Sequence, residues 1–156
     1  MKRKLLALSL GLIISLSSAS ALAMSAQEAK NLADTYVPAD AQYSILMNDK
    51  KDLIFYYHSD IDNYKVKFDK KNEFIRALYI EKIIPPQSTS VKLSDIDAMN
   101  ILEATYPDAK LTRITRFNEP EQTFYNLEFT FDGGTGDMNI LAADGTIIDT
   151  TLLYDK

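Results

Sequence analysis

Apolar residues recur at helical spacing near the start of the chain, after residue 24. Ser25 and Glu28 stand three positions apart as a capping-box pair, in which each side chain can bond the backbone N–H of the other residue. Pro38 stops the pattern, because proline does not continue a helix. The pattern therefore predicts a helix over residues 25–36. Its apolar positions are Ala26, Ala29, Leu32, Ala33 and Tyr36.

After this helix the pattern changes to short β-rich runs that are separated by polar turns. The predicted strands are Gln42–Met47, Leu53–His58, Tyr64–Phe68 and Phe74–Ile80. The turns between them are only a few residues long, which favours antiparallel pairing of consecutive strands.

The same order then occurs a second time. Residues 84–90 contain two prolines and several small polar residues, which is typical of a connector. Ser94 and Asp97 repeat the helix-capping pattern, and Pro107 ends the second helix. Four more strands follow, and Asp144-Gly145 is a two-residue hairpin signal. The strands are predicted at Lys110–Phe117, Thr123–Phe131, Met138–Ala143 and Thr146–Leu153.

The two halves of the chain show an internal repeat. Ser25, Ala29, Asn31 and Leu32 align with Ser94, Ala98, Asn100 and Ile101, each 69 positions later. We therefore expect an α+β fold of two tandem repeats, each with one helix packed on a four-stranded antiparallel sheet. The predicted boundaries are 24–82 for the first repeat, 83–92 for the linker and 93–156 for the second repeat.

Residues 1–23 have the pattern of a signal peptide. A basic start at residues 2–4 precedes an apolar run, and Ala21-Leu22-Ala23 is a typical cleavage site. The run is too short to span a bilayer comfortably, so we expect an exported protein, periplasmic or extracellular, that is cleaved after Ala23 and then has no membrane segment. Cleavage leaves 14 of the 17 basic residues against 22 acidic ones, a net charge of −8, which disfavours nucleic-acid binding.

The residue composition excludes several kinds of chemistry. The chain has no cysteine, so disulfides, thiol catalysis, Cys-ligated metals and lipid attachment to a cysteine are excluded. No nucleophile elbow or phosphate-binding loop is present either. The one histidine, His58, precedes Asp60 and Asp62, a set that could hold a divalent ion but is more typical of solvated surface. The sequence therefore predicts a non-enzymatic protein without a cofactor or resident metal.

The candidate binding residues are those on the second face of strands that are apolar on both faces. In residues 53–58 and in residues 123–131, one set of alternate positions is expected to meet a helix, and the other set has no assigned neighbour. The unassigned residues are Ile54, Tyr56, His58, Phe124, Asn126 and Glu128. Two interpretations remain open at this point: the apolar members pack between the two halves, or the whole set docks a partner.

Both halves resemble PepSY domains, the small modules found in propeptides of thermolysin-type metalloproteases and in bacterial envelope proteins. The resemblance rests on residues 94–109 with their Tyr-Pro-Asp-Ala ending, on residues 125–131 as a strand, and on residues 143–148 as the closing hairpin. The first half departs from the pattern, because Lys70-Lys71-Asn72-Glu73 replaces the Asp-Gly turn. The tandem arrangement is also similar, in fold only, to a secreted β-lactamase inhibitor.

The resemblance implies a binding module that restrains a peptidase or another envelope protein by protein–protein contact. A periplasmic protein that binds or senses a small ligand or a divalent ion is the alternative, in which Asp60 and Asp62 would attract the ion. The sequence leaves the oligomeric state open, because an uncovered sheet face can also dimerise.

Overall fold

The structure, a computed structural model, describes residues 24–156. The predicted signal peptide, residues 1–23, lies outside the described part of the chain. Both predicted helices are confirmed: α1 spans Ala26–Ala33 and continues as the 3₁₀ turn η1 (Asp34–Tyr36), and α2 spans Asp95–Thr105. Each begins with a complete capping box, because the Ser side chain and the acidic side chain three residues later bond each other's backbone N–H groups. Within residues 24–156, no helix has the length and apolar character needed to cross a bilayer.

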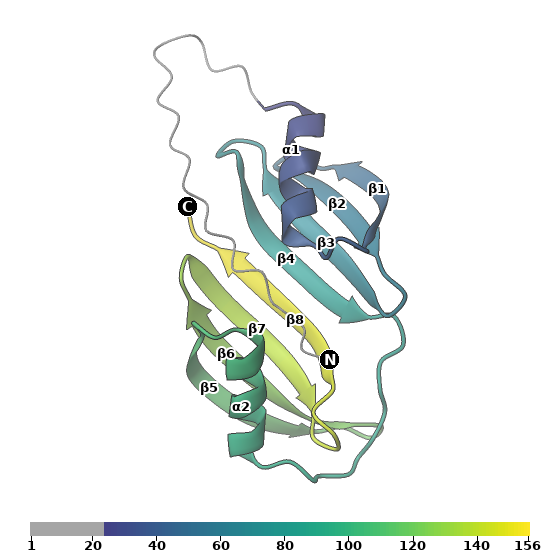
Figure 1. Cartoon of the computed structure of the whole chain (residues 1–156), viewed down its shortest axis with the longest axis vertical. Helices are drawn as coiled ribbons and strands as arrows, with labels where there is room; N and C mark the ends of the chain where they lie inside the picture. The colour runs from purple at the N-terminus through teal and green to yellow at the C-terminus, as the bar shows by residue number, and fades with distance from the viewer. Residues whose placement is uncertain (1–23) are drawn as a thin grey trace.

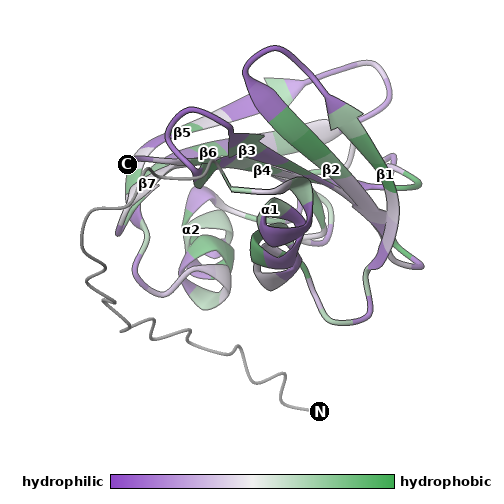
Figure 2. Ribbon diagram, turned by 90° about the horizontal axis from the view of Figure 1, so that it is seen from above, coloured by the Kyte–Doolittle hydropathy of each residue, from purple (hydrophilic) through white to green (hydrophobic). Residues whose placement is uncertain are grey.

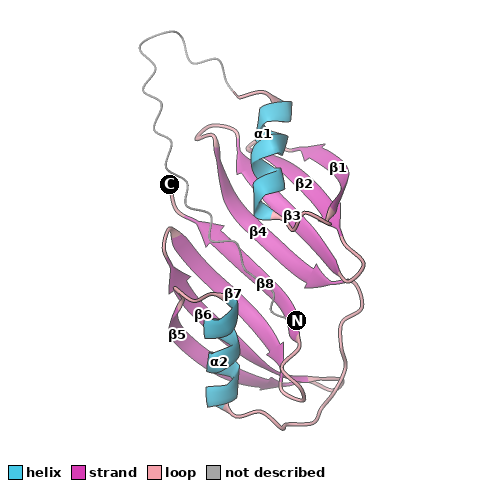
Figure 3. Cartoon of the chain, in the orientation of Figure 1, coloured by secondary structure: helices cyan, strands magenta, loops and turns pink. Residues whose placement is uncertain are grey.

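Eight strands make up most of the remainder (Figure 3). They are β1 (Gln42–Asn48), β2 (Asp52–His58), β3 (Asp62–Asp69), β4 (Phe74–Lys82), β5 (Lys110–Asn118), β6 (Thr123–Phe131), β7 (Gly134–Leu141) and β8 (Ile147–Tyr154). Between β4 and α2 the chain has neither helix nor strand, and the predicted linker, residues 83–92, lies in this segment.

All eight strands form one antiparallel sheet in the order β1-β2-β3-β4-β8-β7-β6-β5 (Figure 1). The predicted fold class, with two repeats that each carry their own four-stranded sheet, is therefore wrong. It fails because β4 and β8 pair along Ala77–Glu81 and Asp149–Leu153, so neither strand is a sheet edge. Local pattern predicted the hairpins, but the pairing of two strands about 70 residues apart is not encoded in any turn.

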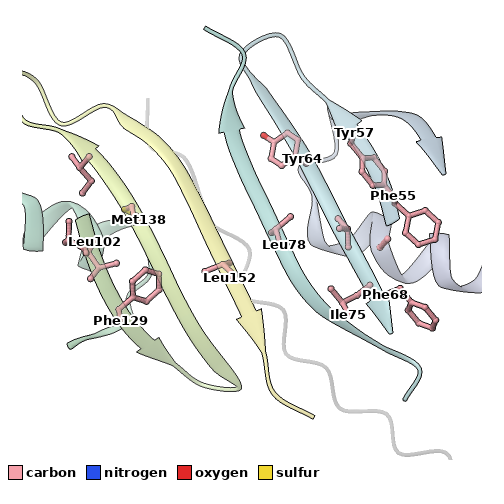
Figure 4. Close-up of a cluster of buried hydrophobic side chains, with 14 of the residues drawn as sticks. Phe55, Tyr57, Tyr64, Phe68, Ile75, Leu78, Leu102, Phe129, Met138 and Leu152 are labelled. Carbon is pink, nitrogen blue, oxygen red and sulfur yellow. The ribbon is translucent and has the colours of Figure 1, made fainter. Parts of the chain in front are cut away.

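Both helices lie on the same side of the sheet (Figure 2). α1 contacts β2 and β3, and α2 contacts β6. The strand residues that face the helices are almost fully buried and form the core, which Figure 4 shows on both sides of the β4–β8 pair. The largest of those that are less than 2% exposed are Phe55, Phe68, Ile75, Tyr125, Leu127, Phe129, Met138 and Ile140.

The start of β7 differs from the prediction. The strand was predicted to begin at Met138, but β7 begins at Gly134, so only Asp132 and Gly133 separate it from β6. Gly134 and Gly136 therefore lie within the strand. A Cβ atom on Gly136 would be 2.1 Å from the ring of Phe129, and one on Gly134 would be 2.0 Å from the Leu153 carbonyl oxygen. These two glycines therefore provide room for close packing inside the sheet.

The β4–β8 pair gives a prediction with a matched control on adjacent residues. Leu152 faces the helices and is 6% exposed, whereas Leu153 faces the other side and is 46% exposed. We expect Leu152→Ala to lower the free energy of unfolding by about 2–4 kcal/mol and Leu153→Ala by about 1 kcal/mol or less. Urea unfolding followed by circular dichroism measures both, and should show one transition because the sheet is continuous. Equal losses, or two separate transitions in the unmodified protein, would contradict the description of the sheet.

Candidate partner-binding face

The side of the sheet that faces away from α1 and α2 is called the open face below. Side chains alternate between the two sides of each strand, so the residues between the buried core positions all lie on this face. The strand registers show which of them are neighbours. One row crosses all eight strands and contains, in order, Ile45, Tyr56, Lys65, Tyr79, Thr151, Asp137, Glu128 and Arg113.

The β1–β2 end of the open face is apolar and aromatic. Ile54 and Tyr56 are half-buried, and each pairs with a β1 residue, Met47 and Ile45 respectively. Ile45 is 55% exposed and Met47 is 50% exposed, although both are large hydrophobic residues. Large exposed apolar side chains that cluster beside an aromatic ring are typical of protein-contact sites.

Next to this end, on β3 and β4, the face is basic. Lys65 and Lys67 lie on β3, and their Nζ atoms are 4.1 Å and 5.1 Å from the centroid of the Tyr79 ring on β4. The ring face attracts both ammonium groups and keeps them against the sheet. Because neither lysine forms a salt bridge with a carboxylate among residues 24–156, their charge is available to an approaching molecule.

On β7 and β8 the face is acidic. The Asn126 side-chain amide donates to both carboxylate oxygens of Asp137 at 3.0 and 2.9 Å, and also to the Asn139 side-chain oxygen. Asn139 in turn donates to both carboxylate oxygens of Asp149 at 3.0 and 3.1 Å. In the described part of the chain, no Lys or Arg lies within salt-bridge distance of either carboxylate. The network therefore fixes two negative charges without neutralising them.

A shallow hollow of about 420 Å³ lies beside the acidic residues. Its lining is mostly small, with four threonines and a glycine from β5 to β8, together with Asp137 and Glu128. Glu128 is 3.6 Å from Arg113 in a largely exposed pair, which adds little stability. Phe129 and Leu153 complete the lining, so the hollow is a mainly apolar concave region next to the charged residues.

All six residues predicted to bind a partner lie on the open face. Ile54, Tyr56 and His58 are on β2, and the other three are on β6. The seam between the two halves is the β4–β8 pair, so the interpretation that Ile54, Tyr56 and Phe124 pack between the halves is wrong. Phe124 instead stacks on Phe117 of β5, with ring centroids 5.4 Å apart. The structure leaves the proposed binding role of these residues as a prediction.

Two of the three residues of the ion-binding alternative, His58 and Asp62, contact other side chains. The ring Nδ1 of His58 is 2.8 Å from the Ser44 hydroxyl, and Asp62 forms a salt bridge of 2.8 Å with Lys82. Among residues 24–156, no group of three or more His, Asp or Glu side chains is placed to hold a metal ion. The structure therefore adds no support to the alternative.

Sequence reasoning missed the residues in the middle of the face. Tyr79 on β4 and the Asp137 and Asp149 carboxylates on β7 and β8 meet the predicted residues only because the two halves share one sheet. Lys65 and Lys67 alternate with buried residues along β3, and nothing in this local pattern indicates that acidic residues lie on strands across the sheet.

Comparisons with known proteins show only remote similarity. No family model matches the chain, and no curated protein sequence matches it. A solved structure described as a "putative lipoprotein" from Clostridium difficile is 17% identical with a TM-score of 0.36, covering 80% of this chain and 90% of that one. A DUF2874 family protein from Bacteroides uniformis is 12% identical with a TM-score of 0.33, covering 83% and 90%. At these scores the similarities carry no functional argument.

The acidic network predicts a pH-dependent stability. Burial raises the pKa of Asp149 above its ordinary value, the Asn139 hydrogen bond opposes this rise, and the Asp137 and Glu81 charges add to it. Because the folded-state pKa is the higher one, the stability linked to this carboxyl is present at low pH and is lost as the pH rises through the folded pKa. We expect Asp149→Asn to raise the melting temperature at about pH 7 and to leave it unchanged at about pH 3.

Thermal unfolding of both proteins between these pH values measures the difference. Asp60→Asn is the matched control, because Asp60 is an exposed turn residue and should show no such pH-dependent gain. A loss of stability at neutral pH in Asp149→Asn would mean that its charge stabilises the fold, contrary to this description.

Proposed function

We propose that this chain is an exported, non-enzymatic binding module that docks a partner protein on its open face. The observation that carries the proposal is a row of side chains across eight strands that no helix within residues 24–156 covers. From β1 to β6 the row changes from apolar to basic to acidic. On a face that only contacts water, we would not expect the exposed apolar side chains of Ile45 and Met47. Nor would we expect the Asp137 and Asp149 carboxylates to be held in place by amide hydrogen bonds without a cation beside them.

The composition of the open face fits a protein interface. Protein interfaces are enriched in aromatic anchors such as tyrosine, and charged groups beside them select the orientation of the partner. Tyr56 and Tyr79 are rigid aromatic residues in the row that crosses all eight strands, and Lys65 lies between them. Aromatic anchors contribute contact area at low cost in conformational entropy, and the charges fix the orientation of the partner.

The size of the open face is also suitable. A sheet of eight strands, at about 4.8 Å per strand and about seven residues of about 3.3 Å each, offers roughly 900 Å². With an equal area from the partner, about 1,800 Å² would be buried, which is close to the standard size of a stable protein–protein interface.

The partner that fits this face is a folded protein with opposite charges in matching order. It would present an acidic group to Lys65 and Lys67, an apolar group to Tyr56 and Ile54, and a basic group to Asp137. The resemblance of residues 94–109 and 143–148 to PepSY modules supports an envelope or secreted peptidase as this partner. We propose that contact with the open face restrains the peptidase without cleavage of the module.

We also propose that residues 1–23 direct export and are removed after Ala23, so that the module acts in the periplasm or outside the cell. The support is the basic start, the apolar run and the small-residue cleavage site of this segment.

If the proposal is correct, at least one exported peptidase of the source cell is inhibited by the purified module at a molar ratio of about one to one. Tyr56→Ala and Lys65→Glu should each weaken this inhibition at least about tenfold, because the first removes an aromatic anchor and the second reverses a docking charge. Ile96→Ala is the control, since Ile96 is 68% exposed on α2 at the opposite side of the molecule. Inhibition constants from peptidase titration give the comparison, with melting temperatures to verify folding.

Two results would contradict the proposal. One is inhibition that weakens equally in the open-face variants and in Ile96→Ala. The other is that the module, immobilised on a surface, binds none of the exported peptidases when each is applied at micromolar concentration.

A further inference from the structure

The first described residue is hydrogen-bonded to a distant turn. The Met24 backbone N–H donates to Oε1 of Glu73 at 2.7 Å, across 49 positions of sequence. The Met24 side chain is partly buried and packs against the core. Glu73 belongs to the turn between β3 and β4, so this bond joins the start of α1 to the sheet that α1 covers.

Glu73 has an unusual backbone conformation for its residue type. Its φ of 56° makes it the one residue other than glycine with a positive φ among residues 24–156. Such a conformation costs about 1 kcal/mol or more for a residue with a Cβ, and turns normally place glycine or asparagine there. The backbone of the turn is fixed by bonds from Asp69, whose side chain accepts from Lys71 and Asn72 N–H groups. The turn itself therefore gives no reason for a glutamate.

The local electrostatics gives such a reason. Met24 directly precedes Ser25, the N-cap of α1, where the helix dipole is positive. A positive charge on Met24 would be repelled by that dipole, and a carboxylate at hydrogen-bond distance would offset the repulsion. Glu28, the other carboxylate at this end, is already bonded to Ser25 through both the backbone and the hydroxyl.

We propose that Glu73 is the binding site for the N-terminal ammonium group that is created when the chain is cleaved between Ala23 and Met24. Hydrolysis of this amide consumes one water, breaks the C–N bond, and leaves a carboxylate on Ala23 and an ammonium on Met24. The Met24 nitrogen then carries a positive charge at the position where it already donates to Glu73, so a hydrogen bond from an uncharged amide becomes an ion pair. The inference rests on the proposed export.

An ion pair between Met24 and Glu73 would make cleavage after Ala23 affect the stability of α1. α1 packs mainly on β2 and β3 of the sheet, and Met24, directly before its N-cap, is hydrogen-bonded to the β3–β4 turn. The new ion pair would hold the start of α1 against the β3–β4 turn once the signal segment is gone. Removal of the segment would then strengthen the helix end that it leaves behind.

A cycle of four proteins tests the ion pair. Two begin at Met24, after export and cleavage of the full chain, and two carry a Gly-Ser extension before Met24, which keeps its nitrogen as an uncharged amide. Each form is made with and without Glu73→Gln, a substitution that retains the hydrogen-bond acceptor but removes its charge. Glu103→Gln, at an exposed position of α2, is the matched control. The melting temperature is measured at about 20 mM and at about 1 M NaCl.

The coupling is the difference in melting temperature between the Met24 form and the extended form with Glu73, minus the same difference in Glu73→Gln. At low salt, we expect a coupling of about 2 °C. This coupling should fall by at least half at high salt and should persist in Glu103→Gln. A coupling of zero, a coupling that does not depend on salt, or an exported product whose mass shows a start other than Met24 would overturn the inference. Peptidase inhibition does not enter the cycle, so its failure and a failure of this ion pair are distinguishable.

Discussion

The pairing of β4 with β8 is the interaction on which the rest of the structure depends. Without it, both strands would be sheet edges, with unpaired backbone groups beside apolar side chains such as Leu78 and Leu152. The pair satisfies those backbone groups and buries the two leucines side by side on the helix side. It also removes two edges, so that only β1 and β5 remain as edges of the sheet.

The same pairing creates the candidate site. The row that runs from Ile45 to Arg113 takes its residues from both halves of the sequence, and these become neighbours only because Tyr79 is placed opposite Thr151. The basic residues on β3 and the acidic residues on β7 and β8 then share one surface with opposite charges on either side of the seam. Such a surface orients a partner as well as attracting it, because a reversed partner would bring like charges together.

Much of the secondary structure was predictable because its signals are local. Capping boxes, prolines and strand alternation are read within a few residues, and the strand Thr123–Phe131 matches its prediction at both ends. Alternation also placed Ile54 and Tyr56 on the side away from the helices. The start of β7 was not predictable, since glycines that make room for Phe129 look the same in sequence as glycines of a turn. The single sheet was not predictable either, because its central pair is set by packing between distant segments.

The most direct test of this account is an NMR measurement of contacts across the seam in the isotopically labelled protein. Antiparallel pairing predicts interstrand nuclear Overhauser effects that connect Ala77 with Leu153, Tyr79 with Thr151 and Glu81 with Asp149. Their presence would establish the continuous open face on which the proposed function rests. If contacts appeared within β3–β4 and within β7–β8 but not between β4 and β8, the two halves would be separate sheets and the account would be contradicted.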